Sequence, residues 1–246
     1  MYFSLKKLPI SGENPRKHQK AGMTVQIETK QLLDLSHTLA GEYLEQFQYP
    51  WQALDGIKDL ILALGPTLPK QEYTEVQPNV WVHKTAQVFP SAYLGAPCII
   101  GPETEVRHCA FIRGSALVGE KCVVGNSVEL KNVILFDNVQ TPHYNYVGDS
   151  ILGYKSHMGA GSITSNVKSD KTLVTVKDGQ ERLETGRKKF GAILGDHVEV
   201  GCNSVLNPGT VLGRGASVYP VSCVRGVVPE NSIYKTGGVI VPRKED

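Results

Sequence analysis

Residues 94–124, LGAPCIIGPETEVRHCAFIRGSALVGEKCVV, have an aliphatic residue at every sixth position. The same step of six continues on both sides of this stretch and gives ten consecutive apolar residues: Val82, Val88, Leu94, Ile100, Val106, Ile112, Val118, Val124, Leu130 and Phe136. It resumes at Val147, Leu152 and Met158, and returns after an interruption at Leu194, Val200, Leu206, Leu212, Val218 and Val224. Hydrophobic residues make up 41% of the chain, so this run is not accidental, and neither the helical nor the strand period predicts it.

Glycine and other small residues accompany this step. Glycine often follows the aliphatic residue, as at Gly95 and Gly101, and a small side chain usually stands four residues after it, as at Cys98, Ala116 and Cys122. A fixed short period indicates a solenoid, and a six-residue period is typical of β-helices. Three hexapeptides would form one 18-residue coil, which gives roughly seven or eight coils between residues 80 and 230. We therefore expect an all-β solenoid over residues 76–232, with the aliphatic residues pointing inward.

The residues before and after the repeat have a different pattern. Residues 1–25 are polar, with a basic cluster at Arg16, Lys17 and Lys20, and predict a tail or an edge segment. Apolar residues at three- and four-residue steps predict one helix over 27–47 and a second from Pro50 to Gly65. Residues 1–75 would thus hold a tail and a helical hairpin. Residues 233–246 are expected to be a C-terminal tail, and whether it forms an edge strand or reaches a neighbouring molecule stays open.

Charge and composition exclude several classes of protein. The 26 Lys and Arg residues nearly balance the 24 Asp and Glu residues, which argues against a nucleic acid or a membrane as partner. No stretch approaches the roughly 20 apolar residues of a membrane helix, and the N-terminus lacks the order of a secretory signal, so we expect a cytoplasmic protein. The five cysteines form no C-x-x-C pair, which predicts free thiols in a reducing compartment and no zinc site.

Two stretches break the repeat, and function in a solenoid tends to lie where the repeat is broken, because a regular coil needs only packing residues. Within Thr141–Tyr146 the step of six gives Pro142 in place of an aliphatic residue, and the next interval, from Val147 to Leu152, shortens to five. The second break is an insertion over residues 167–191, rich in lysine and arginine, whose middle predicts a projecting β-hairpin.

Three polar residues of the repeat are candidates for chemistry. Arg113 and Lys131 are 18 residues apart, which is one coil, so they would stack about 5 Å apart on one edge. Two stacked cations could bind a phosphate, or they could be solvated surface charges. His143 lies in the first break, where a histidine with an ordinary pKa near 6.5 could act as a general base or be merely structural.

The run from Phe111 to Asn166 resembles a known enzyme family. It is similar, without gaps, to the acetyltransferase domain of bifunctional UDP-N-acetylglucosamine pyrophosphorylase/glucosamine-1-phosphate N-acetyltransferase, a hexapeptide-repeat acyltransferase. The matching motifs are Phe111-Ile112-Arg113, residues 125–131 (GNSVELK), His143-x-x-Tyr146-x-Gly148-Asp149 and residues 159–166 (GAGSITSN).

The resemblance implies a left-handed parallel β-helix and the transfer of acetyl from acetyl-CoA, as co-substrate and without a metal, to an amino-sugar phosphate, glucosamine-1-phosphate first among the candidates. It places His143 on the catalytic base, Glu129 on a carboxylate beside it, and the N–H of Ala160 on the group that holds the thioester oxyanion. The family's sugar-phosphate ligands fall on Arg113, Lys131, Tyr146, Asn166 and Lys171.

The chain departs from the bacterial pattern at several positions. His157 stands where that pattern has a sugar-contacting asparagine, so it is a candidate substrate ligand and the identity of the sugar stays open. Cys202 and Pro220 replace small residues on the expected CoA path beyond Ala160. Residues 185–192 (TGRKKFGA) and 49–54 (YPWQAL) are more similar to archaeal-type sugar-1-phosphate nucleotidyltransferase/acetyltransferases.

We expect no counterpart of the nucleotidyltransferase domain of these enzymes, because residues 1–50 contain no glycine-rich nucleotide loop. The leading hypothesis is an N-acetyltransferase that serves UDP-N-acetylglucosamine biosynthesis. The alternative is a non-catalytic subunit that binds a sugar phosphate or is a scaffold for a separate nucleotidyltransferase. The resemblance also implies a homotrimer with both substrates held between neighbouring β-helices.

Overall fold

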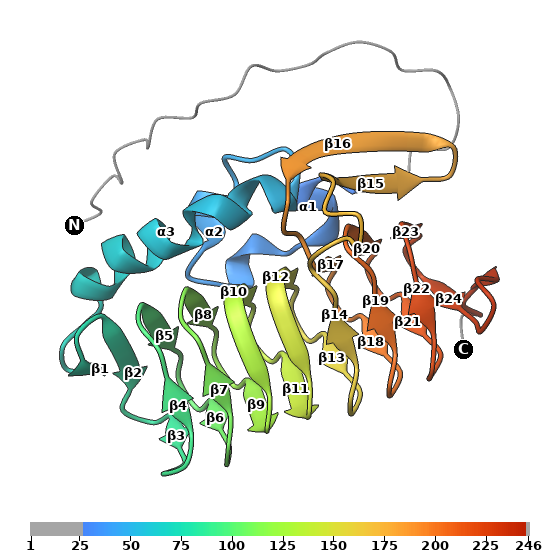
Figure 1. The fold of residues 1–246 in the computed structure, drawn as a ribbon. Helices are drawn as coiled ribbons and strands as arrows, with labels where there is room; N and C mark the ends of the chain where they lie inside the picture. The colour runs from blue at the N-terminus through green and yellow to red at the C-terminus, as the bar shows by residue number, and fades with distance from the viewer. Residues whose placement is uncertain (1–26, 245–246) are drawn as a thin grey trace.

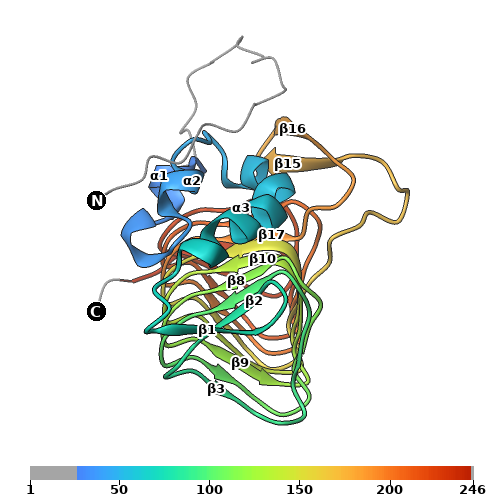
Figure 2. The same ribbon diagram turned by 90° about the vertical axis from the view of Figure 1, so that its left-hand side faces the viewer.

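The computed structural model describes residues 27–244, so the expected tail at 1–25 lies outside the described residues. It is a parallel β-helix with a three-sided cross-section, and helices and a β-hairpin lie along one of its sides (Figures 1 and 2). Every residue of the six-residue series from Ile100 to Phe136 is fully buried. The expected solenoid, with its aliphatic residues inside, is therefore confirmed.

The strands form three faces. The first face contains β3 (Gln87–Val88), β6 (Glu105–Val106), β9 (Val123–Asn126), β11 (Gln140–His143), β13 (His157–Met158), β18 (Glu199–Val200), β21 (Ser217–Val218) and β24 (Ser232–Tyr234). The second contains β4 (Tyr93–Leu94), β7 (Phe111–Ile112), the first parts of β10 (Glu129–Leu135) and β12 (Tyr146–Leu152), β14 (Ile163–Thr164), β19 (Val205–Leu206) and β22 (Cys223–Val224).

The third face contains β2 (Val80–His83), β5 (Cys98–Ile100), β8 (Ala116–Val118), the second parts of β10 and β12, β17 (Ala192–Leu194), β20 (Thr210–Leu212) and β23 (Val227–Val228). Two antiparallel strands close the ends: β1 (Tyr73–Gln77) pairs with β2, and β25 (Ile240–Pro242) pairs with β24. The residues after 233, left open between two roles, thus include an edge strand.

The length of the coil changes at one corner. Cys98 pairs with Ala116, 18 residues on, but Ala116 pairs with Val133 and Val133 with Ser150, 17 residues on. A single left-handed residue, Asn132 (φ 56°) or Asp149 (φ 48°), makes this corner in the short coils, so β10 and β12 run continuously from the second face to the third.

The early shortening corrects one prediction. The five-residue interval expected from Val147 to Leu152 is already present one coil earlier, from Leu130 to Leu135. The following residues therefore move by one position, and Thr141, paired with Val124 and fully buried, takes the inward place that the step of six gave to Pro142.

The helical part differs from the expected hairpin. The helix expected over 27–47 is three short pieces: α1 (Thr29–Leu32), η1 (Leu35–His37) and α2 (Gly41–Leu44). Asp34 accepts hydrogen bonds from the N–H of Ser36, and Thr38 accepts one from Ala40, and such local bonds compete with a continuous helix. The second helix is present as η2 (Pro50–Gly56) and α3 (Ile57–Leu64), followed by η3 (Gly65–Thr67). We call residues 27–67 the N-terminal unit.

The N-terminal unit covers the first part of the third face. Here η2 and α3 contact β8, β10 and β12. Strands β5, β8, β17 and β20 and the second parts of β10 and β12 are buried on both sides. The middle residue of each three-residue segment points outward and is also fully buried: Ile99, Leu117, Ile134, Ile151, Ile193 and Val211. Burial of each such side chain contributes about 1.5–3 kcal/mol.

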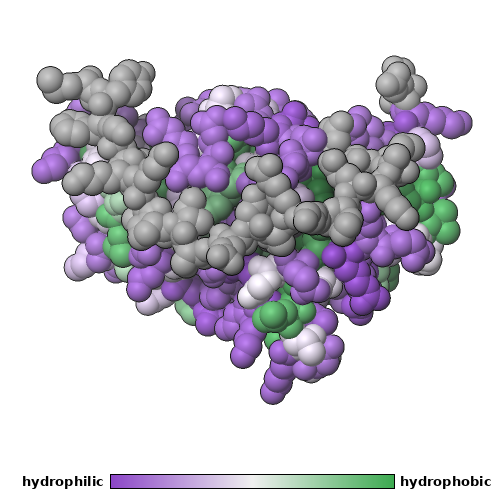
Figure 3. Space-filling view, turned by 90° about the horizontal axis from the view of Figure 1, so that it is seen from above, coloured by the Kyte–Doolittle hydropathy of each residue, from purple (hydrophilic) through white to green (hydrophobic). Residues whose placement is uncertain are grey.

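The insertion forms the expected hairpin, from β15 (Val174–Asp178) and β16 (Glu181–Arg187), but the expectation that it projects is wrong. Strand β15 lies against β20 and β23 with Val174 and Val176 fully buried, so the hairpin continues the cover begun by the N-terminal unit (Figure 1). Hydrophilic residues dominate the described part of this side as seen from above (Figure 3). Among residues 27–244, no helix is both long and apolar enough to span a membrane.

Candidate active site

Asp149 is the centre of a buried polar network. Asp149 is 2% exposed and lies at the corner between the second and third faces. Its carboxylate accepts hydrogen bonds from Lys131 Nζ at 2.8 and 3.1 Å, from Asn132 Nδ2 at 3.0 Å and from Asn166 Nδ2 at 2.6 Å. A buried carboxylate requires such partners, because its desolvation is otherwise costly. The network therefore holds Lys131 and Asn166, two of the expected substrate ligands, in fixed positions.

Arg113 and Lys131 stack one coil apart, as their spacing predicts, but both are paired with carboxylates. Arg113 Nη1 donates to Glu129 Oε1 at 2.9 Å, and this bond raises the pKa of Arg113. The Arg113 side chain is about half exposed, so the pair is a weak one and its guanidinium is open to a ligand. The structure thus brings Glu129 to Arg113.

Tyr146 connects the Asp149 network to the Arg113–Glu129 pair. It lies beside Glu129 on the neighbouring strand, and its hydroxyl accepts a hydrogen bond from Asn166 Nδ2 at 3.2 Å. Burial raises the pKa of Tyr146 and the carboxylates of Asp149 and Glu129 raise it further, so its hydroxyl keeps its proton at neutral pH and can donate it to an acceptor.

His143 lies at the exposed end of β11, at the edge between the first and second faces. Its backbone is fixed from both sides, since its N–H donates to Asn145 Oδ1 at 3.2 Å and its carbonyl accepts from the N–H of Gly161 at 3.0 Å. Buried Asn145 in turn donates to the carbonyls of Gly159 and Ser162. The imidazole makes no hydrogen bond within residues 27–244, so a fixed backbone presents an unengaged ring.

The expected CoA residues form one column with His143. Gln140, His157, Glu199 and Ser217 are in register, so His143, Ala160, Cys202 and Pro220, three residues further in each coil, stack along one edge. The N–H of Asn203 donates to the carbonyl of Ala160 at 2.8 Å, and the N–H of Val221 donates to the carbonyl of Cys202 at 2.9 Å. These bonds connect successive coils along the column. No hydrogen bond from the N–H of Ala160 is present within the described chain. We call these four residues the edge column.

Two expected ligands lie apart from the Asp149 network. His157 is on the first face, and its Nδ1 is 2.7 Å from Glu199 Oε2 of the next coil. Lys171 is exposed, and its N–H bonds to the carbonyl of Lys168 at the start of the insertion. Neither residue contacts Asp149, Tyr146 or His143 in this chain.

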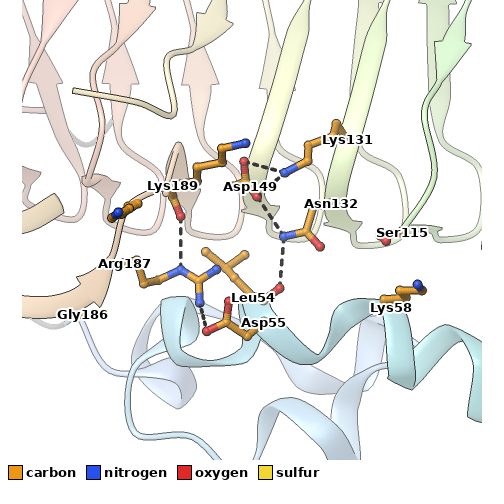
Figure 4. A pocket seen from close by; sticks show the side chains of 11 residues that line it. Leu54, Asp55, Lys58, Ser115, Lys131, Asn132, Asp149, Gly186, Arg187 and Lys189 are labelled. Atoms are coloured by element: carbon orange, nitrogen blue, oxygen red, sulfur yellow. Dashed lines mark hydrogen bonds and ion pairs between the residues drawn. The ribbon is translucent and has the colours of Figure 1, made fainter. Parts of the chain in front are cut away.

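A pocket of about 480 Å³ opens on the other side of the network (Figure 4). Its walls come from the N-terminal unit, the corner of the coils and the segment after the hairpin: Leu54, Asp55, Lys58, Ser115, Lys131, Asn132, Asp149, Gly186, Arg187, Lys188 and Lys189. Apart from Lys131, none of these was predicted as a site residue. The five-residue interval from Leu130 to Leu135 was the available signal for Asn132, but nothing local to the sequence places Lys58 beside Lys131.

Comparisons with known proteins agree with the sequence motifs. Residues 97–216 match the family described as the GMPPB C-terminal domain. The bifunctional sugar-1-phosphate nucleotidylyltransferase/acetyltransferase of Sulfurisphaera tokodaii is 29% identical over 192 residues, which cover 76% of this chain and 47% of that protein. The bifunctional protein GlmU of Methanocaldococcus jannaschii is 34% identical over 113 residues, 45% of this chain and 27% of that protein.

The solved structures are more distant. A hexapeptide transferase family protein from Anaplasma phagocytophilum is 14% identical, and the match covers 67% of this chain and 79% of that one, with a TM-score of 0.38. The chain spans about half the length, or less, of the curated relatives. Over most of its β-helix, the chain is therefore similar to the C-terminal region of GlmU-type bifunctional sugar-1-phosphate nucleotidylyltransferase/acetyltransferases.

Proposed function

We propose that this chain is an N-acetyltransferase that moves the acetyl group of acetyl-CoA to the amine of an amino-sugar phosphate, glucosamine-1-phosphate being the first candidate. The main support is the edge column, in which the free imidazole of His143 stands in line with the unbonded N–H of Ala160 and with Cys202 and Pro220. An extended pantetheine chain can lie along such an edge, since no long side chain of the column crosses it.

The chemistry follows from these groups. The sugar amine attacks the thioester carbonyl, and His143 accepts the proton that the amine loses as the N–C bond forms. The N–H of Ala160 donates to the oxyanion, a contribution typically of about 3–4 kcal/mol. The C–S bond then breaks, and the proton returns from His143 to the CoA thiolate. Glu129 pairs with Tyr146, which follows His143 by three residues, and is available to orient the sugar or the base.

The polar groups on the second face are suited to the acceptor. Arg113 offers a half-exposed guanidinium, and Tyr146 and Asn166, two and three coils further along, offer fixed donors. A guanidinium and neutral donors suit a phosphate and sugar hydroxyl groups. We include Lys131 with these ligands, and His157 and Lys171 as ligands that would act across a subunit boundary, because they lie apart in one chain.

We further propose that the protein is a homotrimer. The edge column is bordered by exposed apolar side chains, among them Tyr144, Tyr219 and Val221, the last 71% exposed. An apolar border around a site is typical of a protein interface. Multi-angle light scattering should give three times the chain mass, and a monomer at micromolar concentration would contradict the trimer.

Because the described cysteines are all free, we place this protein in the reducing cytoplasm.

The activity is tested by thiol release from acetyl-CoA in the presence of glucosamine-1-phosphate. His143→Ala should lower kcat by about 10²–10⁴-fold. His108→Ala is the matched control, because His108 is exposed and lies in the same column two coils earlier, beyond Asn126. Equal activity of wild type and His143→Ala would refute the base assignment. No turnover over a panel of amino-sugar phosphates would leave the alternative, a binding or scaffold subunit.

A further inference from the structure

The pocket behind Asp149 contains more positive charge than its own acids neutralise. Five cationic side chains line it: Lys58, Lys131, Arg187, Lys188 and Lys189. Asp149 pairs with Lys131 at 2.8 Å and Asp55 with Arg187 at 2.6 Å. The other three lysines form no ion pair within residues 27–244. The pocket therefore presents three uncompensated ammonium groups to whatever enters it.

The walls of the pocket are fastened to each other. Asn132 donates to the carbonyl of Leu54 at 3.0 Å, which joins the corner of the coils to the N-terminal unit. The Arg187–Asp55 pair joins the same unit to the segment after the hairpin, and the Arg187 side chain is only 9% exposed. Behind this pair the rings of Trp51 and Phe190 pack 5.8 Å apart, both buried. The cavity is thus preformed, which reduces the entropy that a ligand must overcome.

The lysines reach the pocket from different elements. Lys58 comes from α3 and lies near Ser115, whereas Lys189 points toward Lys131 and Asp149 from the opposite wall (Figure 4). Arg187 Nε donates to the carbonyl of Lys189 at 3.2 Å, which fixes the backbone from which that side chain extends. Ammonium groups from two walls, together with the hydroxyl of Ser115 and the amide of Asn132 in the same lining, are suited to the oxygens of a phosphoryl group.

The pocket is separate from the proposed site of acetyl transfer. Of the predicted site residues only Lys131 lines it, whereas His143, Arg113, Tyr146 and Asn166 do not. In a small amino-sugar phosphate the amine and the phosphate are on neighbouring carbons. With the amine at His143, the phosphate of such a sugar would therefore be bound on the second face. An anion in the pocket is therefore either a different molecule or the distal part of a larger acceptor.

We propose that this pocket is a phosphoryl-binding site in which Lys58, Lys188 and Lys189 bind a phosphate or diphosphate group of a sugar phosphate or a nucleotide. The N-terminal unit is then part of a binding site in addition to being the cover of the third face. The proposal does not depend on acetyl transfer, since it concerns binding alone. It assigns a role to the basic segment 186–189, which the proposed reaction leaves unused.

Isothermal titration calorimetry of the full chain with inorganic pyrophosphate, at low salt, tests the proposal. Lys58→Gln and Lys189→Gln should each weaken binding at least tenfold, as expected for a lost charged hydrogen bond. Lys177→Gln is the matched control, because this lysine is exposed on the hairpin outside the pocket. His143→Ala should bind pyrophosphate as the wild type does, which separates this site from the reaction.

Two further titrations identify the source of the phosphoryl group. Glucosamine-1-phosphate and a uridine-diphosphate hexosamine are compared, each on the wild type and on Lys58→Gln. A loss confined to the diphosphate ligand assigns the pocket to the distal part of a nucleotide sugar, and a loss with the monophosphate assigns it to a simple sugar phosphate. Absence of pyrophosphate binding to the wild type, or equal affinity in Lys58→Gln, Lys189→Gln and Lys177→Gln, would overturn the proposal.

Discussion

The edge column of His143, Ala160, Cys202 and Pro220 and the corner of Asn132 and Asp149 are two edges of the same β-helix. At the first, the side chains are small or unengaged and the edge is bare. At the second, a carboxylate is buried, three side chains donate to it, and the N-terminal unit lies over it. A repeat that needs only inward aliphatic residues leaves its edges free to differ. The bare edge suits a long, extended ligand, and the covered corner suits a fixed pocket for charge.

Loss of Asp149 should cause the largest change, because the covered corner depends on it. Asp149→Ala leaves the Lys131 ammonium and the amides of Asn132 and Asn166 without their acceptor. Since Lys131 is about a quarter exposed, we expect the free energy of unfolding to fall by about 3 kcal/mol, at the low end for a broken buried pair. Urea denaturation followed by circular dichroism measures it, with Glu105→Ala, which breaks the exposed pair with Arg107, as control. A loss below about 1 kcal/mol, as for a surface pair, would show that the two edges do not differ in this way.

The bare edge should become protected when acetyl-CoA binds. Saturating acetyl-CoA should slow maleimide labelling of Cys202 about tenfold, which corresponds to about 1.4 kcal/mol, and leave exposed Cys109 unchanged. Cys98 and Cys122 should stay unlabelled throughout, because burial raises the pKa of both thiols to about 12. Mass spectrometry of the labelled peptides distinguishes the sites. Unaltered labelling of Cys202 would remove the edge column from the CoA path.

A smaller effect tests whether the third face is packed as a core. Ile134→Val should lower the free energy of unfolding by about 1 kcal/mol, since Ile134 points outward from the coil and is fully buried beneath the N-terminal unit. Ile240→Val is the matched change on the edge strand β25, where the side chain is 40% exposed, and should cost less than about 0.5 kcal/mol. Equal losses would mean that the cover contributes little.

The smallest effect concerns a second buried carboxylate under the N-terminal unit. Asp196 accepts from the N–H groups of Asp34 and Tyr154 and pairs with Arg214. Burial raises its pKa above 3.8, so the folded protein holds this proton more tightly than the unfolded chain, and the contribution to stability falls as pH rises from 3.8 through the raised pKa.

Asp196→Asn removes this titration and one acceptor. The variant should therefore be less stable than the wild type by a margin that is larger at acidic pH and narrows as pH rises, then stays constant toward neutrality. Thermal unfolding of both proteins between pH 4 and pH 7 measures the margin. A margin that widens with rising pH would contradict the sign of the shift.

Much of the fold follows from the sequence because a hexapeptide repeat is a local signal. The residues from Ile100 to Leu130 occupy the interior by their period alone, whereas Leu135 takes the inward place that the step of six gave to Phe136. The gaps in the period indicated both breaks. Thr141 escaped prediction because a register shift made at Asn132 is not visible at Pro142. Pairs of consecutive apolar residues on the third face, such as Ile99-Ile100 and Leu117-Val118, indicated that another part of the chain covers this face. The expected base His143 and the expected ligand Tyr146 came from the motifs, and the register of the coils placed Ala160, Cys202 and Pro220 in one column with His143.

The sequence by itself determined the β-helix, the helical segment from Pro50 to Gly65 and the positions of the polar residues along the coils, since each of these is specified by neighbours in the chain. Only the tertiary structure decided that the N-terminal unit and the hairpin lie on the third face, that Asp149 joins Lys131 to Asn166, and that Lys58 and Lys189 line one pocket. Lys58 and Lys189, for example, are 131 positions apart in the sequence. The physical reason is the same for all of these arrangements. The apolar outer surface of the third face must be covered, and whatever covers it brings its own charged side chains to the nearest corner.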